Sequence, residues 1–329
     1  MLKISLIICT YQRPDEIQRL LKTVVIQTTL PDEIIIIDGS LDNKTEKVIQ
    51  EIMQVVGGKL AYIHVNATER GLTRQRNLGI KRAKGKIIAF LDDDTVLQRT
   101  YFEEILACFQ RHPGAVGVGG LIMNSKNWMR VEKKKHPSLG TFRWGEWERR
   151  DDFRWRLRKL LKLDSPLPPG WMPSFGHGRQ SSYPPDGNDY AAEFIMGGAS
   201  AWRSHIFSRV QFSTYFEGYG LYEDLDFCIR SSRLGIILLC TRAQLEHYHA
   251  SSGRPNFFQY GVMVVRNGWF VWRKRWPNPP FGSKLKWLLI TLLLAFLRLV
   301  DLRRSGFEEA LGRFWGMLTL LFRKQGVSL

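Results

Sequence analysis

The sequence predicts an α/β fold with a mostly parallel central sheet flanked by helices, followed by a C-terminal amphipathic helical tail. Two observations predict the sheet. Short apolar runs, typical of strands buried on both faces, recur through the first 120 residues, and stretches with helical spacing separate them. Strand–helix–strand connections of this kind indicate parallel strands. The third observation, two apolar stretches flanked by cations near the C-terminus, predicts the tail.

Four strands and three helices are expected in the first part of the chain. The first strand is Ile4–Cys9, and Pro14 suits the first turn of the helix that follows it, whose apolar positions continue to Val25. The other elements of this part are strands over 33–37, 60–65 and 86–91 and helices over about 44–56 and 72–84. Further on, the pattern predicts a strand-like segment over 194–202, a helix over about 222–234 and a strand over 236–240.

Polar residues follow three of these strands at their carboxyl ends. Thr10 and Tyr11 follow the first strand, Asp38-Gly39-Ser40 follow the second, and Asp92-Asp93-Asp94 follow the fourth. In open parallel sheets, ligands bind beyond the carboxyl ends of the strands. The topology therefore predicts one ligand site that contains all three clusters.

The net charge of +17 is concentrated in two segments. Residues 126–162 hold 13 Lys and Arg against 5 Asp and Glu, and residues 266–329 hold 12 against 3, so the rest of the chain is neutral. Basic segments attract the phosphates of nucleic acids, of lipid headgroups or of phosphorylated acceptors. A solvated basic face is the alternative interpretation.

The middle and the end of the chain depart from the α/β pattern. Residues 122–192 are rich in Trp, Arg, Pro and Gly, with a short basic helix expected over 154–163 and a loop over 166–185. In the tail, the apolar stretches 287–297 and 314–322 are shorter than the roughly 20 residues that span a bilayer. Their flanking cations and tryptophans suit helices that lie in the headgroup layer. A helical hairpin packed on the domain or on a partner subunit is the alternative.

The cysteines and the N-terminus indicate a cytoplasmic protein. Cys9, Cys108, Cys228 and Cys240 include no CxxC pair, and we interpret them as free thiols of a reducing compartment. Met1 leads almost directly into the first strand, so no signal peptide is expected. Together with the basic tail, this predicts a peripheral protein on the cytoplasmic face of the plasma membrane.

Two acidic motifs could supply the chemistry of a group transfer. Asp92-x-Asp94 follows a buried strand, and a divalent cation held there would neutralise phosphates and act as a Lewis acid. In Glu223-Asp224, a carboxylate could take the proton of an acceptor hydroxyl. The alternatives are a solvated turn for the first motif and a favourable charge at a helix start for the second.

Other polar residues have two possible interpretations. Asp38 could accept hydrogen bonds from a base or ribose, or it could cap a turn, and Arg76 could reach a diphosphate or lie on a helix surface. His247 and His249 are one residue apart, and either could complete a metal shell with the aspartates or simply be a satisfied histidine.

In their order along the chain, these motifs resemble the family-2 glycosyltransferases, which have the Rossmann-like GT-A fold. The resemblance covers roughly residues 4–120 and 194–255. The segments that carry it are Ser5–Pro14, Pro31–Ser40, Arg76–Ile80, Ala83–Gly85, Phe90–Asp94, Gly197–Ala199 and Glu223–Asp226. Two positions depart from the family pattern, namely Ile37 before Asp38 and Gln75 before Arg76.

The resemblance implies a role for each matching residue. The residues that would bind the nucleotide sugar are Thr10, Tyr11, Arg13, Asp38, Arg76, Asp92 and Asp93. The ligands of a divalent cation, Mn²⁺ or Mg²⁺, would be Asp94, Asp92 and His249. Asp224 would be the general base of an inverting transfer from a nucleotide sugar to a hydroxyl.

We therefore expect a GT-A domain over 1–283 and basic, membrane-proximal amphipathic helices over 284–329. Within the domain, 1–120 would bind the nucleotide sugar, 121–192 would be an irregular basic insertion, and 193–283 would bind the acceptor. The expected partners are a nucleotide-sugar donor, a saccharide or lipid-linked saccharide acceptor of surface-polysaccharide or glycolipid synthesis, and an anionic membrane surface.

Two other function classes stay open at this point. One is a metal-dependent nucleotidyltransferase, for which the first strand lacks a loop rich in Gly and Lys. The other is a non-enzymatic nucleic-acid-binding protein, which would interleave basic and aromatic residues on a platform. The positive charge instead avoids the predicted sheet, so we expect no nucleic-acid partner.

Overall fold

The structure is a computed structural model that describes residues 2–131, 138–216, 218–250, 255–301 and 303–322. The chain forms two compact units, each made of two separate segments. The first unit contains Met1–Lys126 and Ser181–Arg254, and the second contains Asn127–Gln180 and Pro255–Leu329. The domain boundaries predicted from the sequence, 1–283 and 284–329, group the chain differently and stay a prediction.

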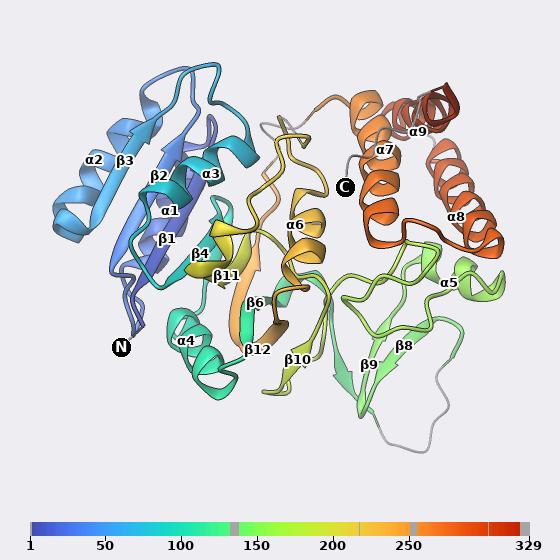
Figure 1. The fold of residues 1–329 in the computed structure, drawn as a ribbon, viewed down its shortest axis with the longest axis horizontal. Coiled ribbons are helices and arrows are strands. Elements are labelled where there is room, and N and C mark those ends of the chain that lie inside the picture. The colour runs from blue at the N-terminus through green and yellow to red at the C-terminus, as the bar shows by residue number, and fades with distance from the viewer. Residues whose placement is uncertain (1, 132–137, 217, 251–254, 302, 323–329) are drawn as a thin grey trace. The chain divides into compact units, whose positions relative to one another are not determined.

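The first unit is built on one large sheet, which Figure 1 shows with its flanking helices. Among the described residues the strand order is β10-β12-β6-β11-β4-β1-β2-β3, and β5 pairs with β12. The strands are β1 (Ile4–Thr10), β2 (Glu33–Asp38), β3 (Leu60–His64), β4 (Ile87–Asp92), β5 (Thr95–Leu97), β6 (Ala115–Ile122), β10 (Asp189–Ala191), β11 (Ala199–Arg203) and β12 (Ile236–His247). The helices are α1 (Pro14–Val24), α2 (Lys44–Val56), α3 (Leu72–Arg82), α4 (Tyr101–Arg111) and α6 (Glu223–Ser231).

Four of the eight strand pairs in the described sheet are parallel, and β1, β2, β3 and β4 form a continuous parallel block, as the sequence predicts; β10 and β5 run antiparallel to β12. β1 pairs in parallel with β2 and β4, β2 with β3, and β6 with β12. β11 lies between β4 and β6 and runs antiparallel to both. The predicted α/β fold with a mostly parallel sheet is confirmed.

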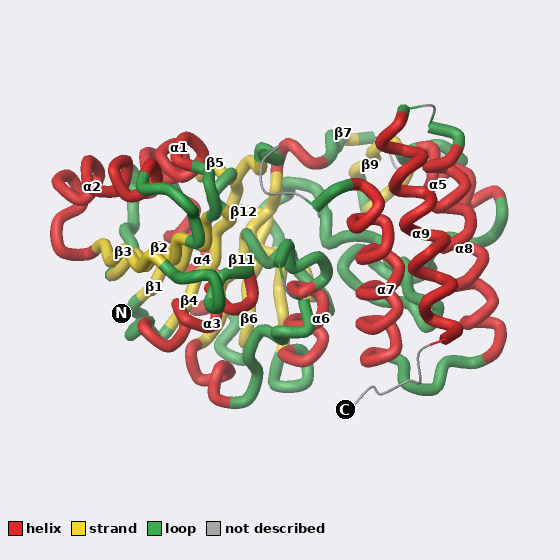
Figure 2. Tube along the Cα trace, turned by 90° about the horizontal axis from the view of Figure 1, so that it is seen from above, coloured by secondary structure: helices red, strands yellow, loops and turns green. Residues whose placement is uncertain are grey.

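Helices cover both faces of the sheet because alternate side chains of each buried strand point to opposite sides. On β1, Leu6 and Ile8 belong to the core that also holds the apolar faces of α1 and α4. Ile7 points the other way, toward Gly79 of α3. Figure 2 shows α1 and α3 on opposite sides of the strands. This two-faced burial explains why the strands are continuous apolar runs.

The strand predicted over 236–240 is longer in the structure and continues to His247. Beyond Cys240 the burial alternates, with Thr241, Ala243 and Leu245 fully buried and the residues between them partly exposed. A half-buried strand has this period of two. The prediction stopped at Cys240 because the continuous apolar run ends there.

The second unit combines a small sheet with four helices. Its strands are β7 (Met129–Arg130), β8 (Thr141–Trp144) and β9 (Trp147–Arg150), in the order β7-β9-β8. Its helices are α5 (Phe153–Leu160), α7 (Phe257–Arg275), α8 (Phe281–Leu299) and α9 (Arg304–Phe322). The basic helix expected over 154–163 is therefore present as α5, and residues 166–185 contain no helix or strand, as predicted.

Ionic and aromatic contacts hold the irregular part of the second unit together. The buried guanidinium of Arg179 donates to Asp151 at 2.8 Å and 3.2 Å and to Asp164 at 2.8 Å. The ring of Trp155 lies 4.0 Å from this guanidinium. Elsewhere in this unit, Trp272 of α7 stacks on Trp287 of α8 with ring centroids 5.3 Å apart. None of the helices in the described parts of the chain is both long enough and apolar enough to cross a membrane.

Candidate active site

The carboxyl ends of β1, β2 and β4 bring the predicted polar clusters to one edge of the sheet. Thr10 is paired in register with Asp38, and Cys9 with Asp92. Adjacent strands lie about 4.8 Å apart, so the clusters are spread over roughly 10 Å of this edge. The expected convergence of strand ends is therefore present in the first unit.

Asp93 is held in place by side chains at the end of β1 and in the loop that follows it. Its side chain is buried, and its Oδ2 accepts a hydrogen bond of 2.7 Å from Thr10 Oγ1. Its Oδ1 accepts one of 2.9 Å from a guanidinium nitrogen of Arg13, and the same nitrogen lies 3.7 Å from Asp94 Oδ2. Thr10 and Arg13, predicted to bind the nucleoside, thus orient the residues Asp92-Asp93-Asp94, which we call the acidic turn.

Asp92, Asp94 and His247 form a group with metal-ligand geometry. One oxygen from each aspartate and one ring nitrogen lie within 4.8 Å of one another. His247 Nε2 is 2.8 Å from Asp94 Oδ1 and 4.0 Å from Asp92 Oδ2. Asp94 Oδ1 is thus in contact with His247, and Oδ2 accepts a hydrogen bond of 3.0 Å from the Ala250 N–H. Two carboxylates beside an imidazole nitrogen suit Mn²⁺ or Mg²⁺.

His247 occupies the place for which the resemblance implied His249. β12 ends at His247, where it pairs with Thr95 of β5, and the Asn124 side chain hydrogen-bonds both the N–H and the C=O of His247. His249 lies two residues beyond the strand, with its ring 4.4 Å from the ring of His247. The geometry therefore favours His247 as the ligand, and a role for His249 stays a prediction.

Two glycines allow Asp224 and Asp92 to approach the same stretch of backbone. The N–H of Gly197 donates to Asp224 Oδ2 at 3.2 Å, and the C=O of Gly198 accepts from the Asp92 N–H at 3.0 Å. A Cβ on Gly198 would lie 2.0 Å from Asp92 Cγ, and one on Gly197 would lie 2.8 Å from Asp224 Cβ. Only glycine fits at these two positions. Because neither glycine has a side chain, Asp224, the predicted base, lies next to the acidic turn.

Arg76 forms ion pairs with both Asp92 and Glu223. Its buried guanidinium makes ion pairs with Glu223 Oε1 and, at 3.2 Å, with Asp92 Oδ1, and it lies 5.2 Å from the centre of the Phe212 ring. Burial alone would lower the pKa of Arg76, but the charges of Glu223 and Asp92 outweigh it and hold the pKa above its usual value. In the structure Arg76 thus positions two carboxylates, and its predicted approach to the phosphates of the donor stays a prediction.

Asp38 is fully buried and makes hydrogen bonds within the protein through both oxygens. Oδ1 accepts from the Ser40 N–H and Oδ2 from the Tyr62 hydroxyl, each at 2.8 Å. These contacts shape the loop after β2, so the predicted contact of Asp38 with a nucleoside stays a prediction. Tyr11 is partly exposed beside this loop, with the Arg70 guanidinium 5.7 Å from its ring centre.

Three carboxyls of the site have raised pKa values, whereas for Asp94 the effect of burial is outweighed by hydrogen bonds from His247 and the Ala250 N–H, which lower its pKa. Burial raises the pKa of Asp93 to about 7, although Arg13 and Thr10 oppose the shift. Burial also raises the pKa of Glu223 to about 8 against the opposing charge of Arg76. The pKa of Asp224 is raised by burial, and its hydrogen bonds from the Gly197 and Leu225 N–H groups partly offset this. A more basic carboxylate is a better proton acceptor near neutral pH.

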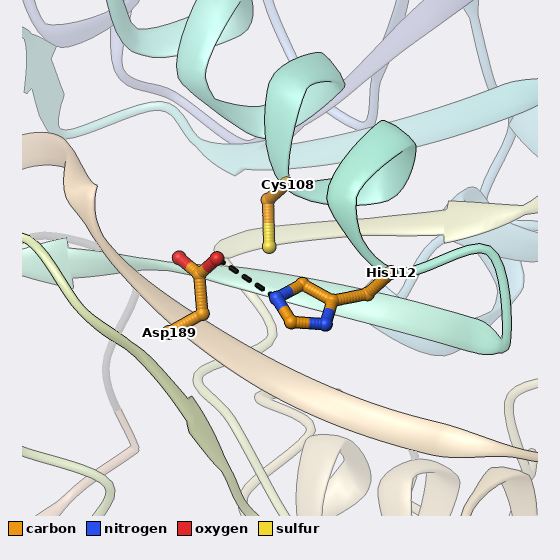
Figure 3. Close-up of side chains that lie close together, drawn as sticks. All are labelled: Cys108, His112 and Asp189. Atoms are coloured by element: carbon orange, nitrogen blue, oxygen red, sulfur yellow. Dashed lines mark hydrogen bonds and ion pairs between the residues drawn. The ribbon is translucent and has the colours of Figure 1, made fainter.

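A second group of potential ligands, shown in Figure 3, is better explained as a structural cluster. Cys108 of α4, His112 just after it and Asp189 of β10 lie close together, with His112 Nε2 3.0 Å from Asp189 Oδ2. However, the Arg111 guanidinium donates to both Asp189 oxygens at 3.0 Å and 3.2 Å. A hydrogen bond with Cys240 and burial raise the pKa of the Cys108 thiol, which disfavours the thiolate that a metal requires.

Sequence reasoning missed the role of one residue of the site. Glu223 was noted only as a neighbour of Asp224, and its pairing with Arg76 spans 147 residues, which no local pattern can indicate. His247 was named beside His249 as a possible ligand, and the structure favours it because β12 continues up to it. The arrangement as a whole can hold a cation, orient the acidic turn and present one basic carboxylate.

Comparison with known proteins shows the family of the chain. A model of the family described as "Glycosyl transferase family 2" matches residues 5–171, just over half of the chain. The glucosyl-dolichyl phosphate glucuronosyltransferase of Haloferax volcanii is 25% identical over 124 residues, which are 37% of this chain and 39% of that protein. The cholesterol galactosyltransferase of Borreliella burgdorferi is 30% identical over 103 residues, 31% of this chain and 27% of that protein. Only a minor part of each relative's length is therefore matched.

Among solved structures, a crystal structure of GalNAc-T7 with UDP, GalNAc and Mn²⁺ has a TM-score of 0.57 at 14% identity, covering 98% of this chain and 57% of that one. This likeness concerns the fold, and it confirms the predicted GT-A fold. The match to the family model, together with the acidic turn after β4, leads to one conclusion. This chain belongs to glycosyl transferase family 2.

Proposed function

We propose that this chain is a metal-dependent, inverting glycosyltransferase that transfers a sugar from a nucleoside-diphosphate sugar to a hydroxyl of its acceptor. One observation carries the proposal. The glycine pair Gly197-Gly198 brings Asp224 next to Asp92, and Asp92 in turn belongs to the group with Asp94 and His247. A cation-binding group and a basic carboxylate thus lie at one edge of the sheet.

Different residues of the site would have different roles in the transfer. Asp92, Asp94 and His247 would hold a divalent cation, which would act as a Lewis acid toward the leaving diphosphate. Arg76 and Arg13 keep the acidic turn in place through their ion pairs with Asp92 and Asp93.

Asp224 would take the proton of the acceptor hydroxyl as its oxygen attacks the anomeric carbon from the face opposite the leaving group. Displacement from that face inverts the anomeric configuration. The raised pKa of Asp224 supports this role because the carboxylate must bind a proton during the reaction. Its Oδ2 is oriented by the Gly197 N–H, and Oδ1 by the Leu225 N–H at 2.8 Å.

We further propose that the acceptor is a lipid-linked saccharide, used at the cytoplasmic face of the plasma membrane for surface-polysaccharide or glycolipid synthesis. The names of two relatives support a lipid acceptor, since one acts on glucosyl-dolichyl phosphate and the other on cholesterol. The Mn²⁺ and UDP in the GalNAc-T7 structure support the choice of cofactor and donor class for a chain of this fold.

The test is a panel of nucleoside-diphosphate sugars offered to the full chain with lipid-linked saccharides and Mn²⁺ or Mg²⁺. We expect release of a nucleoside diphosphate with one donor. Asp224→Asn and Asp94→Asn should each lower the rate by about 100-fold or more. Glu51→Gln, which makes the same chemical change on the exposed side of α2, should leave the rate unchanged.

Three results would contradict the proposal. Pyrophosphate release from nucleoside triphosphates, with no turnover of any sugar donor, would favour a nucleotidyltransferase. Full activity of Asp224→Asn would remove this residue from the role of base. A product that keeps the anomeric configuration of the donor would exclude the single displacement.

A further inference from the structure

The two units differ sharply in charge. Residues 127–180 and 255–329, which make up the second unit, contain 25 Lys and Arg against 9 Asp and Glu, a net charge of +16. The first unit contains 23 against 22, a net charge of +1. The basic character of the chain therefore belongs almost entirely to the second unit, outside the candidate active site.

Helix α8 of this unit has two apolar faces. One face, which includes Trp287 and Ile290, is buried within the protein. Apolar residues are exposed toward both ends of the helix, whereas residues 290–295 between them are buried or partly buried. The exposed apolar residues are Phe281 (79%), Leu285, Leu288, Leu289, Phe296 and Leu299, followed by Val300 (74%) directly after the helix. An amphipathic helix that only needed to pack on its own domain would carry polar residues there.

Helix α9 repeats the arrangement beside α8. Gly312 and Gly316 face α7, and a Cβ on Gly312 would lie 2.0 Å from the carbonyl oxygen of Phe258, so the two backbones touch. On other sides of the helix, Phe307, Leu311, Trp315 and Leu318 are between 44% and 54% exposed. Figures 1 and 2 both show α8 and α9 side by side, and Phe314 meets Phe296 edge to face with ring centroids 5.5 Å apart.

Exposed cations accompany these apolar residues. Lys284 and Lys286 lie in the first turns of α8, and Arg303 and Arg304 lie at the start of α9 with 85% and 92% of their side chains exposed. Exposed leucine, phenylalanine and tryptophan next to lysine and arginine are the composition of helices that lie in the interface of a membrane. Neither helix could cross the bilayer.

We propose that the exposed residues of α8 and α9 form a docking surface for an anionic lipid bilayer, with Leu288, Leu289 and Trp315 among the side chains that enter the acyl boundary. If a second copy of the chain docked here through the same surface, two second units, each with a net charge of +16, would face each other. Repulsion between these like charges opposes such a dimer. A nucleic acid would satisfy the cations but would leave the apolar side chains in water. A bilayer that contains anionic lipids satisfies both.

The test compares two matched triple variants of the full chain. Leu288→Ser, Leu289→Ser and Trp315→Ser remove apolar side chains from the docking surface. Ile26→Ser, Leu41→Ser and Ile236→Ser remove side chains of similar exposure from the first unit. Each protein is floated with vesicles of phosphatidylcholine alone and of phosphatidylcholine mixed with phosphatidylglycerol. Circular dichroism melting checks that each variant folds.

We expect the wild-type chain and the control variant to float with the anionic vesicles and to detach as salt is raised. The docking-surface variant should bind the vesicles about 100-fold more weakly, because it loses the free energy gained when three large apolar side chains are partly buried in the bilayer. Replacing Arg303 and Arg304 by Gln should weaken binding about fivefold per charge.

Three results would overturn the proposal. The first is equal flotation of the docking-surface variant and the wild-type chain. The second is concentration-dependent dimerisation in sedimentation velocity that this variant abolishes, which would assign the surface to a second copy. The third is salt-sensitive binding of a single-stranded oligonucleotide without vesicle binding. None of these outcomes depends on whether the chain transfers a sugar.

Discussion

The substitution Gly198→Ala adds one methyl group, which should push Asp92 of the acidic turn away from the backbone that also holds Asp224, the proposed base. Gly198 stands directly before β11, which pairs with β4 so that Ala199 lies opposite Leu91. Its φ angle is not positive, so alanine can adopt the same backbone conformation. The added Cβ would nevertheless lie 2.0 Å from both Cγ and Oδ2 of Asp92. Carbon atoms in contact are about 3.5–4.0 Å apart, so the overlap is roughly 1.5 Å or more.

The overlap can be relieved in two ways, and both disturb the site. If the Asp92 carboxylate swings aside by more than about 1 Å, its 3.2 Å ion pair with Arg76 breaks and the metal group loses one member. A displacement of that size in a reacting centre costs about 100-fold in rate. If β11 moves instead, the central sheet is strained, which costs about 1–3 kcal/mol of unfolding free energy.

The assay measures kcat/KM with the active donor and, independently, Mn²⁺ affinity by electron paramagnetic resonance. We expect Gly198→Ala to lower kcat/KM by about 100-fold and to weaken Mn²⁺ binding. Gly114→Ala is the matched control, because its added Cβ would have no atom within 4 Å. Wild-type kinetics and wild-type Mn²⁺ affinity in Gly198→Ala would show that Asp92 does not lie against this glycine, and the geometry derived for the site would be wrong.

Three further predictions test other parts of the structure. His247→Ala should weaken Mn²⁺ binding by at least about tenfold in the same resonance assay, while His249→Ala should change it little; the reverse order would restore the sequence-based choice. Because the pKa of Glu223 is about 8, its carboxyl is ionised at about pH 9, where Glu223→Gln removes the charge that faces Arg76 and should lower the unfolding free energy in urea by about 3 kcal/mol; no change at that pH would mean that this ion pair is not formed. His177 has its pKa lowered to about 3 by burial, so it stays neutral in the folded chain, and its stabilising effect is complete above pH 6.5 and lost as the pH falls toward 3. Between pH 7.5 and pH 5 this loss is about 2 kcal/mol at most, because the ring in the unfolded chain gains its proton only below its ordinary pKa of 6.5, and His177→Gln should show a flatter pH dependence of urea unfolding than the wild-type chain.

The strands that carry the site were predictable because each is a local pattern. The apolar runs before Asp38 and Asp92 specify buried strands, and a parallel sheet places their carboxyl ends at one edge whatever the details of packing. Asp93 and Asp94 follow by chain connectivity. This part of the argument needs no contact between distant segments.

The rest of the site depends on registers that a single sequence does not reveal. His247 meets Asp94 because β12 is irregular between Cys240 and Gln244 and then pairs with β5. The side of a strand on which a residue falls changes with every shift of one position. A choice between His247 and His249 therefore required the structure, as did the discovery that Arg76 points at carboxylates from two distant segments.

Charge balance gives the proposed cation a physical reason beyond the resemblance. Asp92, Asp93, Asp94, Glu223 and Asp224 stand against the guanidiniums of Arg13 and Arg76 and the ring of His247. Burial opposes the ionisation of Asp93, Glu223 and Asp224 and raises their pKa values, and the charges of neighbouring carboxylates add to this effect. A divalent cation beside Asp92 and Asp94 would favour the ionised form of these carboxyls, since an added positive charge stabilises every neighbouring carboxylate. Without such a cation, burying so many carboxyls would cost stability, so the acidic turn suits a bound cation better than it suits a solvated loop.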